Sequence, residues 1–144
     1  MLKVKLLSST AKAPTIAHPG EDLGYDLYAS ATVIIPPRGH AIVPTGIAIE
    51  LTTATGAPLG ALLRDKSSMA ARRLTVTGGV IDAGYRGEIR VLMENLGDAV
   101  AEIHMGDKLV NMIPYPVLTT PVEVCEELSE TNRNAGGFGS SGRK

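Results

Sequence analysis

Short apolar segments alternate with turn-forming residues along most of this chain. The pattern is clearest over residues 88–95, where one face of an extended strand carries Ile89, Val91 and Met93 and the other carries Glu88, Arg90 and Glu94. Similar runs predict strands over residues 33–35, 41–43, 46–51, 79–81, 100–104, 109–113 and 122–128. Sixteen glycines and nine prolines separate these runs at short intervals. Short strands with frequent turns are typical of an all-β sandwich or barrel.

One short helix is predicted within this pattern, over residues 68–73, with a serine able to cap its first turn. The segment 64–70 places two basic side chains and two hydroxyl groups where a strand passes into this helix. Because the N–H groups at a helix start favour anions, the segment is a candidate phosphate site. An ordinary capped helix with solvated charges would produce the same pattern.

The chain of 144 residues fits one compact domain, and we find neither an internal repeat nor a linker. We expect residues 1–128 to form the folded core. Residues 129–144 are rich in glycine and serine and hold one large apolar side chain, Phe138, so this segment should be mobile without a partner. Composition alone favours a disordered tail, and the single phenylalanine is the argument against that interpretation.

The charge balance limits the partners of the chain. Fourteen basic side chains against fifteen acidic ones give a net charge of −1, which disfavours binding to a nucleic acid backbone. No apolar run approaches the roughly 18 residues that span a membrane, so we expect a cytoplasmic protein that does not bind membranes. Cys125 is the only cysteine, which excludes an intrachain disulfide, and we expect it to be a small buried apolar residue.

Two segments outside the predicted helix could carry chemistry. Residues 82–87 are predicted to form a β-hairpin turn, in which Asp82 is either a turn former or a general base acting on a water molecule. Residues 137–142 match G-x-G-x-x-G but lack the strand and helix of a dinucleotide fold. Their glycines and serines could still surround phosphate oxygens, with Arg133 contacting a terminal phosphate. The three histidines lie too far apart in sequence for a transition-metal site.

Five segments resemble, in order, the five sequence motifs of the trimeric dUTPase family. They are residues 24–29 (GYDLYA), 66–70 (KSSMA), 79–87 (GVIDAGYRG), 106–111 (GDKLVN) and 133–142 (RNAGGFGSSG). Lys66 stands where the family usually has arginine, and Asn111 stands where it usually has glutamine. Whether Lys66 or the nearby Arg64 fills the role of that arginine is left open by the sequence.

The resemblance implies an all-β subunit with a distorted, β-clip-like jelly roll. It also implies a homotrimer with three active sites at subunit interfaces. Residues 129–144 would form a C-terminal arm that crosses to a neighbouring subunit and closes its site. The reaction implied is hydrolysis of dUTP to dUMP and pyrophosphate, which limits uracil incorporation into DNA and supplies dUMP for dTMP synthesis.

The resemblance also assigns roles to individual residues. Asp82 would activate the water that attacks the α-phosphorus, and Tyr85 would pack against the deoxyribose and exclude ribonucleotides. The uracil ring would be recognised by the backbone of Gly79, Val80, Ile81, Asp82 and Arg90, and would stack on Phe138. The phosphates would contact Lys66, Ser67, Ser68, Arg133, Gly139 and Ser140. Mg²⁺ would be held by the triphosphate and by waters that Asp26 and Asn111 position in its outer sphere, Asn111 also being substrate-binding.

Two other functions share the implied fold. A dCTP deaminase would need a glutamate three positions before Asn95, where this chain has Leu92, and we place the nearby Glu94 in the opposite phase from such a site. A catalytically silent nucleotide-binding protein would not need both Asp82 and Tyr85. Both features favour the dUTPase interpretation.

Overall fold

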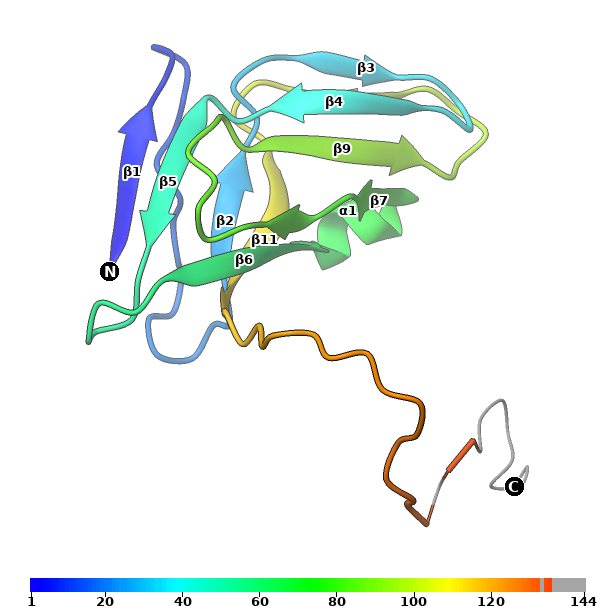
Figure 1. The fold of residues 1–144 in the computed structure, drawn as a ribbon. Helices are drawn as coiled ribbons and strands as arrows, with labels where there is room; N and C mark the ends of the chain where they lie inside the picture. The colour runs from blue at the N-terminus through cyan, green and yellow to red at the C-terminus, as the bar shows by residue number, and fades with distance from the viewer. Residues whose placement is uncertain (133, 136–144) are drawn as a thin grey trace.

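The computed structural model describes residues 1–132, 134 and 135, and this part of the chain is all-β (Figure 1). Its strands are β1 (Leu2–Leu6), β2 (Tyr25–Tyr28), β3 (Val33–Ile35), β4 (His40–Pro44), β5 (Ile47–Leu51), β6 (Leu59–Asp65), β7 (Leu74–Thr77), β8 (Val80–Ile81), β9 (Arg90–Asn95), β10 (Ala101–Ile103) and β11 (Lys108–Pro116). The one helix among the described residues is α1 (Ser67–Ala71), and it is not long or apolar enough to cross a membrane.

The strands form two larger sheets and two smaller pairs, all antiparallel. The larger sheets have the strand orders β2-β11-β6-β8 and β4-β9-β7, and the pairs are β1-β5 and β10-β3. The apolar core draws on all four; its fully buried members include Leu27, Ile35, Val43, Ile47, Leu74, Val91, Ile103 and Met112. Because every sheet contributes to this core, residues 1–116 fold as one body around it.

The alternating pattern over residues 88–95 is confirmed in β9. Ile89, Val91 and Met93 are at most 1% exposed, whereas Arg90 lies on the opposite face. The strand begins at Arg90 rather than at residue 88, because Ile89 bonds to the chain between β4 and β5. The hydroxyl of Thr45 donates to the carbonyl of Ile89, whose own N–H donates to the carbonyl of Ile47 over 2.9 Å.

The strands predicted around residues 33–35, 41–43, 46–51, 79–81, 100–104 and 109–113 are found, with shifted ends. Strand β11 continues to Pro116, beyond the predicted end. The alternation did not predict β1, β2, β6 or β7 as strands. In β6 (LGALLRD) the apolar residues are consecutive, so a period of two is hidden.

Helix α1 begins and ends one to two residues earlier than predicted, and the serine cap is wrong. Lys66 occupies the N-cap position, and no side chain bonds to the first turn. The helix is held instead by Met69, which is 5% exposed and packs into the core. Ser67 and Ser68 therefore keep their hydroxyl groups exposed at the start of the helix.

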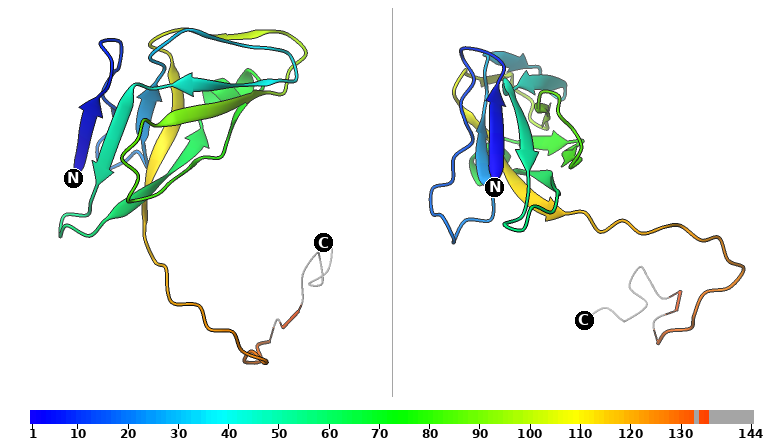
Figure 2. Two further views of the ribbon diagram at one scale, coloured as in Figure 1. Left: turned by 45° about the horizontal axis from the view of Figure 1, so that its top comes forward. Right: turned by 60° about the vertical axis from the view of Figure 1, so that its left-hand side comes forward.

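The segment after β11 leaves the body of the molecule, as the views in Figures 1 and 2 agree. Residues 117–132 form neither strand nor helix, so the strand predicted over 122–128 is wrong for the single chain. Val122, Val124 and Leu128 are 93%, 96% and 87% exposed, and Cys125 is exposed rather than buried. The apolar alternation is present there, but no strand or core of the same chain lies against it.

Candidate functional site

Residues 82–89 connect β8 to β9 and form the loop that carries Asp82 and Tyr85. The predicted β-hairpin is wrong, because β8 pairs with β6 and β9 pairs with β4 and β7. The end of the loop bonds to the β4–β5 corner instead, where the Glu88 carboxylate accepts the N–H of Gly46 over 2.9 Å. The two ends of the loop, at β8 and at β9, therefore diverge, and a cavity lies between them.

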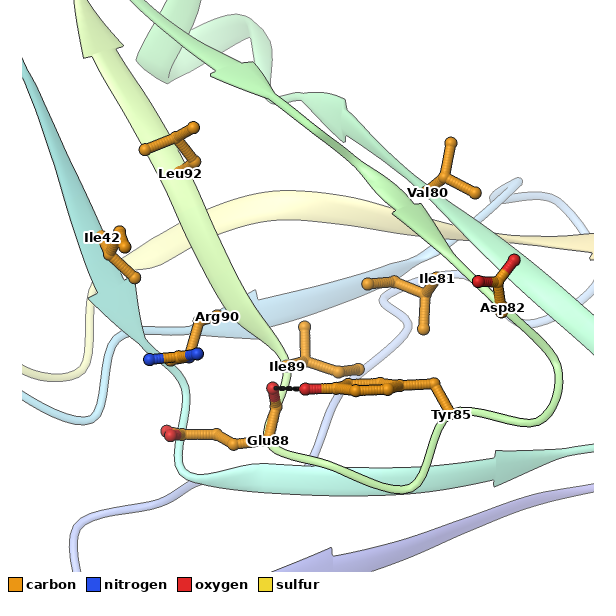
Figure 3. Close-up of a pocket in the computed structure, with 9 residues that line it drawn as sticks. All are labelled: Ile42, Val80, Ile81, Asp82, Tyr85, Glu88, Ile89, Arg90 and Leu92. Atoms are coloured by element: carbon orange, nitrogen blue, oxygen red, sulfur yellow. Dashed lines mark hydrogen bonds between the residues drawn. The ribbon is translucent and has the colours of Figure 1, made fainter.

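This cavity measures about 270 Å³ and combines aliphatic walls with four polar side chains (Figure 3). The aliphatic lining consists of Ile42, Val80, Ile81, Ile89 and Leu92, and the polar residues of the predicted site that line it are Asp82, Tyr85 and Arg90. Glu88 completes the wall. An apolar cavity with a few polar groups is the usual form of a small-molecule site.

The ring of Tyr85 is fixed across the loop. Its hydroxyl donates to the carbonyl of Glu88 over 3.0 Å, and its N–H donates to the carbonyl of Asp82 over 3.0 Å. The ring lies directly over Gly87: a Cβ there would fall 2.6 Å from the ring carbon that bears the hydroxyl. The lack of a side chain at Gly87 is therefore what admits the ring into this position.

Two glycines let the backbone of β8 approach β6 closely. A Cβ at Gly79 would lie 2.7 Å from the carbonyl oxygen of Leu63, and a Cβ at Gly60 would lie 2.9 Å from that of Ile81. The N–H of Leu63 donates to the carbonyl of Gly79 over 2.7 Å. The backbone of Gly79 thus faces β6 and also lines a neighbouring cavity. Val80 and Ile81 form β8, and the predicted residues Gly79 and Asp82 flank this two-residue strand directly.

A second cluster of predicted site residues gathers at the other end of the sheet. Asp26 on β2, Lys66 at the start of α1 and Asn111 on β11 line one cavity of about 290 Å³, together with Lys108. The Lys66 ammonium lies 2.5 Å from one carboxylate oxygen of Asp26, and the Lys108 ammonium lies 2.7 Å from the other. Asn111 is the direct cross-strand partner of Asp26. Three residues from three separate motifs are thus brought together.

The electrostatics of this cluster centre on Asp26, which is 7% exposed. Burial alone would raise the pKa of its carboxyl, but the hydrogen bonds and charges of Lys108 and Lys66 outweigh it and hold that pKa below its usual value. The same contact raises the pKa of Lys108. Asp26 is therefore an anion at neutral pH, with both oxygens engaged by ammonium groups.

The donor set at this cluster suits a magnesium ion that keeps most of its waters. Among the described residues no three His, Cys, Asp or Glu side chains gather closely enough to hold a metal by themselves. One carboxylate and one amide, Asp26 and Asn111, stand side by side. Mg²⁺ bound through phosphates and waters needs no more protein oxygen than this.

Asp82 and Lys66 lie near opposite ends of β6 within one chain. Ile81 pairs with Ala61 near the start of β6, whereas Lys66 follows the last residue of that strand. The intervening strand spans roughly 15 to 20 Å at ~3.3 Å per residue. The two clusters therefore occupy two separate cavities of the same chain.

The remaining predicted residues are distributed as follows. Ser67 and Ser68 directly follow Lys66. Arg64 stands opposite Asn111 in the sheet but lines a different cavity, with Asp65, Gly78 and Gly79, which favours Lys66 as the basic group of the second cluster. Arg133, Phe138, Gly139 and Ser140 lie outside the described residues.

Two structural details differ from what the sequence suggested. Lys108 was not singled out, although its place in the fourth motif, next to a glycine and an aspartate, was a usable signal. Glu94 was placed in the wrong phase: it shares with Leu92 the face of β9 opposite the core, and only Leu92 reaches the cavity. The deaminase interpretation still fails, because an apolar side chain stands where its glutamate is needed.

Comparison with known proteins identifies the family. The dUTPase family model matches residues 9–142. The deoxyuridine 5′-triphosphate nucleotidohydrolase of Clostridium tetani is 41% identical over 99% of this chain and 97% of its own length. The dUTPase of Staphylococcus bacteriophage 80alpha with dUpNHpp has a TM-score of 0.90 and 26% identity, covering 99% of each chain. A mutant dUTPase of phage phi11 of S. aureus, described with a structural Mg(II) ion, has a TM-score of 0.79 and 25% identity over 88% of this chain and 97% of that one. This chain belongs to the dUTPase family.

Proposed function

We propose that the enzyme hydrolyses dUTP to dUMP and pyrophosphate. The observation that carries the proposal is the cavity between the two ends of the 82–89 loop, where Asp82 and Tyr85 lie beside aliphatic side chains. The match of nearly the whole chain to dUTPases supports it. The phage 80alpha dUTPase bound to dUpNHpp is a relative that takes this class of nucleotide.

In the proposed reaction Asp82 is the general base. Its exposed carboxylate, at the mouth of the cavity, accepts a proton from water as the water oxygen bonds to the α-phosphorus. The bond from that phosphorus to the bridging oxygen breaks, and pyrophosphate leaves with the electron pair. One proton is then on Asp82 and the other on the new phosphate group of dUMP, from which solvent takes it.

The nucleoside occupies the cavity itself. Tyr85, fixed over Gly87, packs against the deoxyribose and fills the space that a 2′-hydroxyl would need. Backbone groups of residues 79–82 and of Arg90 bond to the edge of uracil, and Phe138 stacks on the ring. An edge that bonds to a carbonyl oxygen rejects cytosine, because a buried amino group would be left facing another donor.

The triphosphate lies against the second cluster. Lys66, Ser67 and Ser68 contact its oxygens, with Arg133, Gly139 and Ser140 added from the C-terminal segment. Asp26 and Asn111 would hold waters of a phosphate-bound Mg²⁺, which when bound offsets the charge that builds on the leaving pyrophosphate. The phi11 relative is described with a structural Mg(II) ion.

The subunit is a distorted jelly roll that works as a homotrimer with shared sites. Because Asp82 and Lys66 stand near opposite ends of β6 and line separate cavities, we infer that one triphosphate does not contact both within a single chain. A neighbouring copy must then supply Lys66 to the cavity that holds Asp82. The exposed apolar side chains of Val122, Val124 and Leu128 fit a segment that packs on another copy. Residues 129–144 continue from it as the arm that closes a site.

A product assay across four nucleotides tests this function. With dUTP, dCTP, dTTP and UTP as substrates, we expect rapid pyrophosphate release from dUTP alone. The variant Asp82→Asn keeps the shape of the side chain but cannot accept a proton, so kcat should fall about 100-fold or more with dUpNHpp binding retained. Asp98→Asn, at a surface pair with Arg38, is the matched control. Ammonia release from dCTP would indicate a deaminase instead. Nucleotide binding without any product would indicate a catalytically silent binding protein.

A further inference from the structure

Lys108 holds the carboxylate of Asp26 independently of Lys66. The two ammonium groups bond to different oxygens of the same carboxylate, Lys66 over 2.5 Å and Lys108 over 2.7 Å. They come from different places in the fold. Lys108 is the first residue of β11, which pairs directly with the strand of Asp26, whereas Lys66 stands outside the sheet at the N-cap of α1.

A β-bulge in β11 brings Lys108 to this side of the sheet. Residues 108 and 111 are separated by three positions, so in a regular strand their side chains would point to opposite faces. The register shifts between Lys108 and Val110, and the two consecutive residues Leu109 and Val110 are both fully buried. The extra residue lets Lys108 and Asn111 both face the cavity that contains Asp26. Bulges re-aim side chains in this way.

We propose that Lys108 is a positioning residue for the reaction: it keeps the Asp26 carboxylate in place while Lys66 turns from that carboxylate to the phosphates of the nucleotide. The inference rests on the proposed function, in which Lys66 binds phosphate and Asp26 positions the waters of the metal.

The physical reason is the cost of leaving a buried carboxylate without a partner. The Asp26 side chain is 10% exposed and that of Lys66 is 21% exposed. If Lys66 were the only partner, its transfer to a phosphate would leave Asp26 an unpaired charge at a largely buried position, which is costly. Lys108 remains on the other oxygen throughout, so the transfer leaves the carboxylate paired. Among the described residues, the other titratable groups around this cluster are His18 and Asp22, which line the same cavity and pair with each other, and Tyr28, the cross-strand partner of Lys108.

The test compares Lys108→Met with Lys108→Arg by equilibrium binding of dUpNHpp over a range of Mg²⁺ concentrations. Methionine keeps the length of the side chain and removes its charge. We expect about tenfold weaker binding of dUpNHpp and a higher Mg²⁺ requirement in Lys108→Met. Lys108→Arg keeps a cation for Asp26 and should bind within about threefold of the unaltered enzyme. Binding of dUMP, which lacks the β- and γ-phosphates, should be unchanged in both variants.

Two further variants make the result decisive. Lys3→Met removes a surface ammonium that pairs with Glu50 over 2.7 Å and should change neither binding constant. Asp26→Asn should itself raise the Mg²⁺ requirement if the proposed function of Asp26 holds. An unchanged Mg²⁺ requirement in Lys108→Met, next to a raised one in Asp26→Asn, overturns the role of Lys108 alone. No change in Asp26→Asn overturns the underlying role of Asp26. A loss of dUMP binding in Lys108→Met also counts against positioning, because it indicates general damage to the fold.

Discussion

At the scale of single residues, the position of the Tyr85 ring depends on the absence of a side chain at Gly87. The ring lies over Gly87 and is tied by its hydroxyl to the carbonyl of Glu88. Neither contact can be read from the order of residues alone, since both need the loop to fold back on itself. In the proposed function, Gly87 therefore supports the sugar-binding surface by leaving room for the Tyr85 ring.

Gly87→Ala should reproduce the effect of Tyr85→Ala. The added Cβ overlaps the ring, so the ring must move out of the space that a 2′-hydroxyl would occupy. We expect the preference for dUTP over UTP to fall about tenfold or more in both variants, as a ratio of kcat/KM values. Gly84→Ala, in the same loop with nothing near its Cβ, is the control and should keep the preference. A Gly87→Ala enzyme with the full preference would assign sugar selection to another residue.

The sequence identifies residues that act together within one short motif more readily than residues that meet only when distant segments fold together. Asp82 and Tyr85 lie in one short motif, and the structure places both at one cavity. Asp26, Lys66 and Asn111 lie in three motifs, and the resemblance to a family was needed to connect them. The contact of Lys108 with Asp26 depends on a bulge that the spacing of charged residues does not encode, so its place in the fourth motif is the one sequence signal for it.

At the scale of secondary structure elements, the end of β6 presents two basic residues to two different cavities. Lys66 lines the cavity of Asp26, whereas Arg64 lines the one beside Gly79. We therefore expect Lys66→Met to lower kcat/KM for dUTP about 100-fold, because a direct cationic contact with phosphate is lost. Arg64→Met should stay within about threefold of the unaltered enzyme, and Lys66→Arg should retain most of the activity. Steady-state kinetics of the three variants checks the assignment, and a severe Arg64→Met beside a mild Lys66→Met would reverse it.

The contacts between β2 and β11 give the fold an acid-sensitive element. Lys108 and Lys66 hold the pKa of Asp26 below the ordinary value of 3.8, against the opposing effect of burial. A carboxyl with a lowered pKa in the folded state contributes stability that is complete above its unfolded value and is lost as the pH falls through the folded one. Asp26→Asn should therefore cost about 1 to 3 kcal/mol at pH 7, by urea unfolding without nucleotide or metal. The cost should shrink toward pH 3; a cost that does not depend on pH would contradict the ion-pair explanation.

The elements that the sequence predicted well are those whose partners lie in the same chain. In β9 the alternation matches the burial of Ile89, Val91 and Met93, because the core they face is formed by this chain. Residues 122–128 alternate in the same way, yet Val122 and Val124 are almost fully exposed. An apolar face predicts that the strand packs against another apolar surface, but it does not indicate whether that surface belongs to the same chain. The predicted hairpin at residues 82–87 failed for a related reason, since its second arm bonds to the β4–β5 corner.

At the scale of the whole molecule, the proposed function requires sites that are shared between copies. One chain holds the cavity of Asp82, the proposed nucleoside site, near one end of β6 and the cluster of Lys66, the proposed phosphate site, at the other. Both are built by rigid sheet contacts, so the chain cannot bend to join them. In the proposed function, the two halves form a complete site when the cavity of one copy meets the cluster of its neighbour. In a closed ring of three copies, each cavity would face the cluster of one neighbour, which gives three complete sites.

Mixing two inactive variants tests this claim most directly. Asp82→Asn chains keep the phosphate cluster and Lys66→Met chains keep the nucleoside cavity, so neither homotrimer has an intact site. After subunit exchange at equal amounts, a shared site draws its cavity from a Lys66→Met chain and its cluster from an Asp82→Asn chain. We expect about one quarter of the sites to be intact and about that fraction of the dUTP turnover to return. If exchange is confirmed by mass spectrometry and turnover stays at the level of the separate variants, Asp82 and Lys66 act within one chain and the account is wrong.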